Sequence, residues 1–179
     1  MSGAPDANHR NNDQRAYAVA SAALRFILPE PYIPSTHSPE LVMTRIRIKA
    51  GPFEFFGQLE EIAAPRTCAR FLQLLPYTNK VIHSRWSGEA VWIPLGDLDL
   101  GLEYENHTSH PSRGDILLHL GKFSETEFLF AYGSSCFASK VGQLAGNHFL
   151  TVIEGTEHFA AFGKLVLWEG AQDIEFSLA

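Results

Sequence analysis

The sequence predicts a mainly β domain, an antiparallel barrel or sandwich with one main helix, on three observations. Short apolar runs recur along most of the chain, and several alternate apolar with polar residues as half-buried strands do. One stretch repeats its apolar residues at helical spacing. Thirteen Phe and ten Pro among 179 residues fit many short strands joined by turns.

Length and charge limit the classes of partner. With 179 residues, 45% of them hydrophobic, the chain has ample material for one core. A formal net charge of −6 argues against nucleic acid and anionic membrane surfaces, because both attract basic proteins. No apolar run is long enough to span a membrane. Cys68 and Cys136 form no disulfide framework, which favours a reducing, cytoplasmic location.

Residues 1–42 differ in composition from the rest and are predicted to be a leader. The first fifteen are polar and predict disorder. Residues 16–28 favour a short helix, and the prolines that follow keep the chain extended. A start assigned too far upstream and an added docking segment both explain this leader. No signal-peptide cleavage site follows its apolar part.

Residues 43–179 are predicted to form the domain. Ile46 and Ile48 alternate with charged residues, which predicts a half-buried strand, and residues 53–59 form its hairpin partner. Residues 64–75 are the predicted helix, with Cys68 on its apolar stripe and therefore read as a core residue. Closure is favoured because it removes exposed strand edges. Further strands are expected over residues 80–86, 90–93, 102–105, 115–120, 126–132, 148–153, 163–168 and 173–178, with a long loop at 133–147.

The most reactive cluster is His-Ser-Arg-Trp-Ser-Gly-Glu at residues 83–89, between two predicted strands. Strand alternation places His83 and Arg85 on one face and Trp86 on the other, which makes Trp86 the structural residue. Arg85 offers a planar fork for a carboxylate or amide, and His83 can transfer protons near neutral pH. Glu89 can orient His83 or neutralise Arg85. The alternative is an Arg–Glu pair that closes a turn, with Trp86 filling the core.

A second cluster runs from Tyr132 to Cys136 at the end of a predicted strand. Small residues such as Ser134 let backbone N–H groups face a ligand there. Cys136 could act as a nucleophile if His148 or His83 removed its proton. The motifs of cysteine enzymes are absent, which favours a packed thiol.

Asn147 and His148 follow a segment with two glycines, Gly142 and Gly146, at the start of a predicted strand. The segment lacks the strand-to-helix context of a phosphate loop, so nucleotide binding is not expected. His83, Glu89 and His148 are conceivable metal ligands, but no short-spaced pair of histidines supports them, and His107 and His110 are expected to be loop residues. We therefore expect no metal site and no cofactor.

These motifs, in this order, resemble those of the cyclophilin-like barrel superfamily and, more closely, of a bacterial family of unknown function with that fold. The resemblance covers about residues 43–179. It implies a closed antiparallel β-barrel of about eight strands with one main helix. The motifs are Ala64-Pro65, Leu74-Leu75-Pro76-Tyr77, residues 83–89, Ile93-Pro94-Leu95-Gly96, Ser124-Glu125-Thr126-Glu127, Ala131-Tyr132-Gly133 and residues 142–148.

The resemblance also bears on activity. True cyclophilins are peptidyl-prolyl isomerases with a Phe-His-Arg motif and a Gln-Gly-Gly segment. Here His83-Ser84-Arg85 has an extra residue and the second segment is missing, so isomerase activity is not expected. Other relatives of the fold, domains similar to 5-oxoprolinase and allophanate hydrolase, handle small cyclic amides and ureas. By analogy they suggest a substrate class, although fold does not determine function.

We therefore expect the domain to bind a small anionic or amide-bearing metabolite in a pocket at the barrel mouth. Both a binding domain and an enzyme fit these residues. The alternative is a non-enzymatic module that binds an extended peptide or a partner subunit along a groove. Strand edges and the apolar residues 16–28 make a homodimer plausible. The expected site residues are His83 and Glu89 as acid and base, with Arg85, Trp86, Tyr132, Ser134, Cys136, Asn147 and His148 as ligand contacts.

Overall fold

The alternation that predicts the first strand is present in the structure, a computed structural model that describes residues 43–179. β1 (Arg45–Ala50) buries Ile46 and Ile48 and exposes the charged residues at each end of that pair. It pairs antiparallel with β2 (Phe53–Leu59), which matches the predicted hairpin. The leader predicted over residues 1–42 lies outside the described residues.

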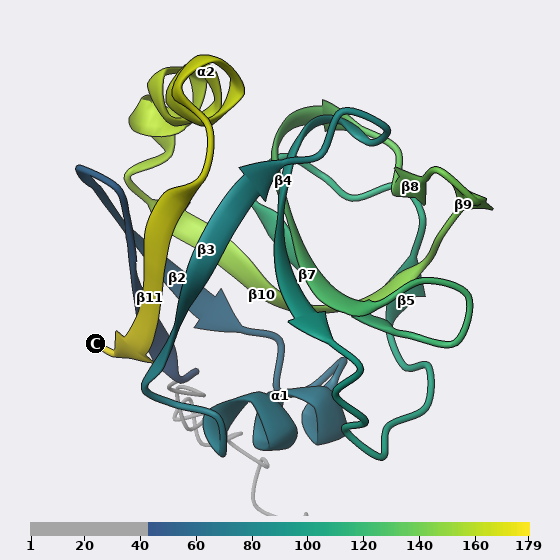
Figure 1. Cartoon of the computed structure of the whole chain (residues 1–179). Coiled ribbons are helices and arrows are strands. Elements are labelled where there is room, and N and C mark those ends of the chain that lie inside the picture. Colours follow the sequence, from purple (N-terminus) through teal and green to yellow (C-terminus); the bar gives the residue numbers. More distant parts are fainter. Residues whose placement is uncertain (1–42) are drawn as a thin grey trace, which may run out of the picture. The chain divides into compact units, whose positions relative to one another are not determined.

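Eight strands close into an antiparallel barrel in this part of the chain, as predicted (Figure 1). Around the barrel the order is β2-β1-β11-β3-β4-β7-β6-β10, and pairing of β10 with β2 completes the ring. The two-residue strand β5 (His107–Thr108) pairs with β10 at the edge of this sheet. Two more short strands, β8 (Ala138–Ser139) and β9 (Gly142–Gln143), pair with each other in a separate sheet. The remaining barrel strands are β3 (Tyr77–His83), β4 (Gly88–Gly96), β6 (Asp115–Leu120), β7 (Thr126–Ser135), β10 (Gly146–Glu154) and β11 (Gln172–Leu178).

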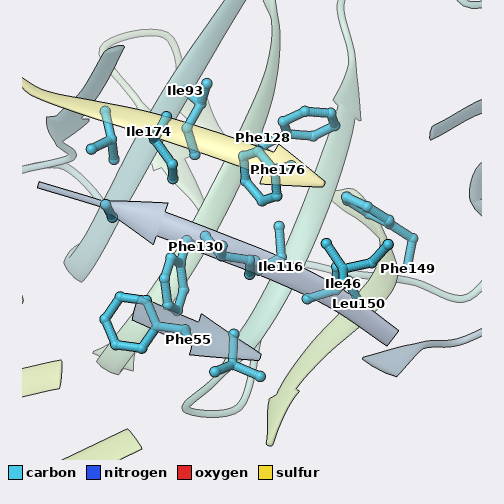
Figure 2. Close-up of a cluster of buried hydrophobic side chains, with 14 of the residues drawn as sticks. Ile46, Phe55, Ile93, Ile116, Phe128, Phe130, Phe149, Leu150, Ile174 and Phe176 are labelled. Atoms are coloured by element: carbon cyan, nitrogen blue, oxygen red, sulfur yellow. The ribbon is translucent and has the colours of Figure 1, made fainter. Parts of the chain in front are cut away.

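Aromatic rings fill the interior of the barrel (Figure 2). Phe128 packs against Phe149 and Phe176, with ring centroids 5.3 Å and 5.9 Å away. Phe55 meets Phe130 edge-on at 5.8 Å. Such tilted and edge-to-face contacts suit the ring quadrupole, and each ring also removes a large apolar area from water. Many of the Phe residues of the sequence therefore form the packed core inside the barrel.

Helix α1 (Pro65–Leu72) lies across one end of the barrel, the lower end in Figure 1. It is shorter than the predicted residues 64–75 at both ends. Pro65 suits its first turn because a helix leaves that N–H unpaired anyway. Cys68 is 1% exposed, and burial raises the pKa of its thiol to about 12, which confirms its place in the core.

A second helix, α2 (Phe159–Glu169), lies at the opposite end of the barrel, the upper end in Figure 1. It follows a short 3-10 turn, η1 (Thr156–His158). The strand predicted at residues 163–168 is therefore wrong. Phe159, Phe162 and Val166 are buried at helical spacing, whereas the run Leu-Val-Leu-Trp within the helix has the composition of a strand.

Three other predictions differ from the structure. No strand forms over residues 102–105. The loop predicted at 133–147 instead begins with the end of β7, and the β8–β9 hairpin follows. β3 ends at His83, so residues 84–87 form a turn and not the continuation of a strand. Among the described residues, no helix is both long and apolar enough to cross a membrane.

Candidate ligand-binding cleft

A cleft of about 810 Å³ lies between helix α2 and the neighbouring ends of β4 and β7. We call it the Tyr132 cleft. Strands supply one wall, the loop before β6 supplies a second, and α2 supplies the third. The lining residues are Glu89, Pro111, Arg113, Tyr132, Gly133, Ser134, Ser135, Ala160, Gly163, Lys164, Leu167 and Trp168.

Tyr132 connects the cleft to His83 at the end of β3. The Tyr132 hydroxyl oxygen lies 2.7 Å from Nε2 of His83, and the two rings meet edge-on at 5.9 Å. Burial, followed by the charge of Arg85, lowers the pKa of His83, so its ring is neutral at pH 7. Burial and then the charge of Glu89 raise the pKa of Tyr132, so its hydroxyl keeps its proton.

The direction of this hydrogen bond depends on the tautomer of His83. Nδ1 of His83 is buried and has no hydrogen-bond partner in the described part of the chain. A bare acceptor is less costly in a buried place than a bare N–H donor, which favours the tautomer with hydrogen on Nε2. His83 then donates to Tyr132, and the Tyr132 hydroxyl can donate its own hydrogen to a ligand.

Glu89, near the start of β4, is held at the cleft by the backbone of β7. The N–H of Ser134 donates to Oε2 of Glu89 at 2.8 Å. A Cβ atom on Gly133 would stand 2.4 Å from the same oxygen, so only glycine leaves room for the carboxylate there. The position of Glu89 is therefore built into the strand beside it.

Arg113, in the loop before β6, is also fixed at the cleft. Its Nε donates to the carbonyl oxygen of Tyr132 at 3.3 Å, and its Nη2 donates to that of Thr156 at 2.8 Å. The guanidinium also lies over the ring of Phe159, 5.1 Å from the centroid. These contacts orient the cation without cancelling its charge, and no carboxylate pairs with Arg113 among residues 43–179.

Helix α2 packs directly onto the ring of Tyr132. A Cβ atom on Gly163 would stand 2.2 Å from Cε2 of Tyr132, so glycine at this position allows the close approach. Further along the helix, Lys164 adds a second positive charge, and Leu167 and Trp168 add apolar surface. Trp168 is 73% exposed.

The predicted site residues divide into three groups. Glu89, Tyr132 and Ser134 line the cleft, and His83 lies behind Tyr132. Arg85 and Trp86 lie on the turn after β3 and do not line it, because strand alternation stops at His83. Trp86 is 66% exposed, so the alternative in which it fills the core is wrong.

Cys136, Asn147 and His148 form the third group, and they do not line the cleft either. Sγ of Cys136 accepts a hydrogen bond from the side chain of Gln143 at 3.7 Å. Nε2 of His148 lies 2.9 Å from the hydroxyl of Thr151, and it approaches a carboxylate of β6. Residues 43–179 contain no group of three or more His, Cys, Asp or Glu that could hold a metal ion.

Asn147 belongs to a buried network that joins β10 to α1, which we call the Asn147 network. Its Nδ2 donates to Oγ1 of Thr67 and to the carbonyl of Glu103, both at 3.0 Å, and its Oδ1 accepts from the N–H of Glu105 at 3.1 Å. The Glu105 carboxylate accepts from the N–H and hydroxyl of Thr67 at 2.6 Å and 2.7 Å. Burial opposes ionisation of Glu105, but Thr67 and Arg66 together lower its pKa.

Sequence reasoning did not identify Arg113, Lys164 or Trp168 as site residues. Arg113 was read as part of a polar loop. Lys164 and Trp168 are four residues apart and share one side of α2, but that side exists only if the segment is helical. The signal available was the helical spacing of the buried residues Phe159, Phe162 and Val166.

Solved structures resemble the fold of this chain. McbB, solved in complex with tryptophan, matches with a TM-score of 0.55 at 18% identity, over 74% of this chain and 44% of McbB. The hypothetical protein AF2241 from Archaeoglobus fulgidus matches with a TM-score of 0.51 at 14% identity, over 80% and 100% of the two chains. A cyclophilin-type peptidyl-prolyl cis-trans isomerase from Cryptosporidium parvum matches with a TM-score of 0.49 at 15% identity, over 76% and 98%.

At these identities the likeness to McbB and AF2241 concerns the fold alone. The match covers less than half of McbB's own length. No curated protein matches the sequence. The model of one family, described as a protein of unknown function and designated DUF3830, matches residues 46–178.

Proposed function

Because this chain belongs to the DUF3830 family, whose description assigns no activity, we propose a function from its own residues. The Tyr132 cleft binds a small anionic or amide-bearing metabolite. The observation that carries this proposal is Arg113, a cation oriented by two backbone carbonyls and left without a carboxylate partner among the described residues. Lys164 adds positive charge to the same cleft.

The chemistry of the cleft fits such a ligand. Arg113 still has N–H groups free for a carboxylate or amide oxygen, because only Nε and Nη2 donate to the backbone. The Tyr132 hydroxyl supplies a neutral donor. The tryptophan complex of McbB is compatible with binding of small molecules by this fold, but the ligand of McbB is not carried over to this chain.

Acid–base chemistry at the cleft is part of the proposal. Tyr132, whose hydroxyl is hydrogen-bonded to the neutral ring of His83, is the proposed acid. Glu89 presents a carboxylate on the same side as the backbone of Ser134 and is the proposed base. The proposal for Arg85 changes: it acts on the protonation of His83 through its charge and does not touch the ligand.

A second candidate function is recognition of a peptide or a partner subunit. It is favoured by two exposed indoles, Trp168 beside the cleft and Trp86 on the turn between β3 and β4, which are 73% and 66% exposed. Exposed aromatic side chains are enriched where proteins bind other proteins. Such a partner would cover the indoles without requiring the charge of Arg113.

A thermal-shift screen with cyclic amides, ureas, monocarboxylates and dicarboxylates tests the first function. We expect at least one compound to raise the melting temperature, since saturation at about 100 times Kd adds about 2.7 kcal/mol of stability. Arg113→Ala should lower the affinity at least about tenfold. Arg45→Ala is the matched control, because Arg45 is also exposed and lies over a ring, that of Phe56 at 5.2 Å.

Two results would overturn the proposal. One is a screen in which no compound stabilises the wild-type protein. The other is a compound that stabilises Arg113→Ala as much as wild type, measured as the difference between bound and free melting temperatures. Either result would support the second function if a peptide or partner also shields the fluorescence of Trp86 and Trp168 from a soluble quencher.

A further inference from the structure

We infer that the ligand of the Tyr132 cleft carries a positively charged amino group as well as its negative group, as an apolar α-amino acid does. This inference rests on the proposed function and names the class of metabolite. Three features support it: a fixed anion, a fixed cation that does not pair with it, and an apolar wall on α2.

The fixed anion is Glu89. One of its oxygens accepts the N–H of Ser134, and Gly133 leaves space for the carboxylate against the strand. A carboxylate has about four acceptor positions on two oxygens, so one backbone bond leaves most of them open. No lysine, arginine or histidine pairs with Glu89 within the described part of the chain. An ammonium group is the partner that would complete it.

The fixed cation is Arg113, and it shares the cleft with Glu89 without forming an ion pair to it. Both are anchored on β7, Arg113 through the carbonyl of Tyr132 and Glu89 through the N–H of Ser134. Two residues of extended strand span roughly 7 Å. A small molecule with opposite charges at its two ends can therefore contact both anchors.

Electrostatics selects against ligands with one charge. A simple anion is attracted by Arg113 and Lys164 but repelled by Glu89, and a simple cation is attracted by Glu89 but repelled by the two basic residues. A zwitterion satisfies both anchors. Because the anchors are held by backbone groups, they are preorganised, so little side-chain entropy is lost when the ligand binds.

The wall formed by α2 indicates the rest of the ligand. Leu167 and Trp168 supply apolar surface, and the small side chain of Ala160 leaves room beside it. Trp168 can pack its ring face against an aliphatic or aromatic group. The side chain of the bound amino acid is therefore apolar.

Calorimetric titration with the twenty common L-amino acids, each also as its N-acetyl derivative and its primary amide, tests the inference. We expect at least one apolar free amino acid to bind, and its N-acetyl form and its amide each to bind about tenfold more weakly or worse. In Glu89→Gln, the advantage of the free amino acid over its N-acetyl form should largely disappear. In Arg113→Gln, the advantage over the amide should disappear. Glu169→Gln, on α2 but outside the lining, is the control and should keep both preferences.

The outcomes separate this inference from the proposed function. If N-acetyl amino acids or plain carboxylates bind as tightly as the free amino acids, the inference is overturned and anion binding stands. If the preference for the free amino group persists unchanged in Glu89→Gln, the inference is also overturned. If neither amino acids nor any anionic or amide compound binds, the proposed function itself fails.

Discussion

The Asn147 network and the Tyr132 cleft are both polar clusters on one barrel. They differ in how many of their hydrogen-bonding and charged groups have partners within the protein. In the network, both amide hydrogens of Asn147 and its oxygen have partners, and Glu105 is held by Thr67 and Arg66. In the cleft, Arg113 and Glu89 are held by the backbone and not by each other.

This difference distinguishes structural polar residues from binding residues. A buried polar group with all its partners inside the protein stabilises the fold, and it has nothing left for a ligand. A charged group that the backbone orients but does not neutralise keeps its capacity to bind. Asn147 was predicted to contact a ligand from its residue type and position, and the satisfaction of its hydrogen bonds argues for the structural role instead.

The largest effect on stability is expected from Asn147→Ala. The substitution removes three hydrogen bonds and leaves Thr67, the Glu103 carbonyl and the Glu105 N–H without those partners. We expect a loss of about 3 kcal/mol in the free energy of unfolding, measured by chemical denaturation, with ligand affinity unchanged in the folded protein.

Asn106→Gly is the control for that substitution, because Asn106 is exposed, its side chain donates one bond, to the His148 carbonyl, and glycine adopts its positive φ of 45° without strain. Its loss of stability should be well below that of Asn147→Ala. Folded Asn147→Ala protein that no longer binds a ligand of the cleft would break the distinction between the two clusters.

An intermediate effect is expected from Gly163→Ala. In an exposed helix interior this change usually adds about 1 kcal/mol of stability. Here the new Cβ would overlap the ring of Tyr132, so we expect instead a loss of about 1–3 kcal/mol and weaker ligand binding as the ring leaves its place. Denaturation and calorimetry measure the two effects.

The reverse substitution on the exposed side of the same helix, Ala161→Gly, is the control for Gly163→Ala. It should lower stability by about 1 kcal/mol through helix propensity and leave ligand binding intact. A stabilised Gly163→Ala protein with normal binding would show that α2 does not position Tyr132.

The smallest effect is expected from Arg85→Ala. Removing its charge should raise the pKa of His83, which NMR titration of the imidazole would measure, and should change stability by no more than about 0.5 kcal/mol. In wild type, the pKa of His83 is lower in the folded protein than in the unfolded chain. As the pH falls, the unfolded chain therefore binds this proton at a higher pH than the folded protein does. Stability from this group is therefore lost as pH falls below about 6.5, and the variant should lose less.

Lys80→Ala on β3 is the control for Arg85→Ala, since Lys80 pairs with Asp173 and is no cause of the His83 shift. Its His83 pKa should equal that of wild type. A clear fall in ligand affinity in Arg85→Ala would mean that Arg85 is an anchor after all, as its residue type suggested.

The barrel was predictable because its strands carry local signals. Residues 53–59 and 115–120 are strands with the predicted limits, since alternation, short apolar runs and turn residues mark them locally. Helix α1 was predicted from its stripe and from Pro65. Pairing of β2 with β10 joins segments about ninety residues apart, and nothing local in either segment specifies it. The resemblance to a family of unknown function, which the family match confirms, was what indicated a closed barrel.

Half of the site was predictable and half was not, for a physical reason. Glu89, Tyr132 and Ser134 lie at or within two residues of the ends of predicted strands, and they line one cleft. Trp86 was misplaced because the end of β3 was set too late. The cations of the cleft depend on α2 and on the loop before β6, whose positions are set by packing against the barrel.

Helix α2 joins β10 to β11, two strands that are not neighbours in the barrel, and it contributes no strand to the ring. Its inner residues, Phe159 and Phe162, belong to the core, whereas Lys164 and Trp168 are exposed. Selection can therefore alter the outer side of this one helix without disturbing barrel closure. On the proposal that the Tyr132 cleft binds a ligand, the exposed side of this eleven-residue helix is where the choice of ligand can change while the barrel stays the same.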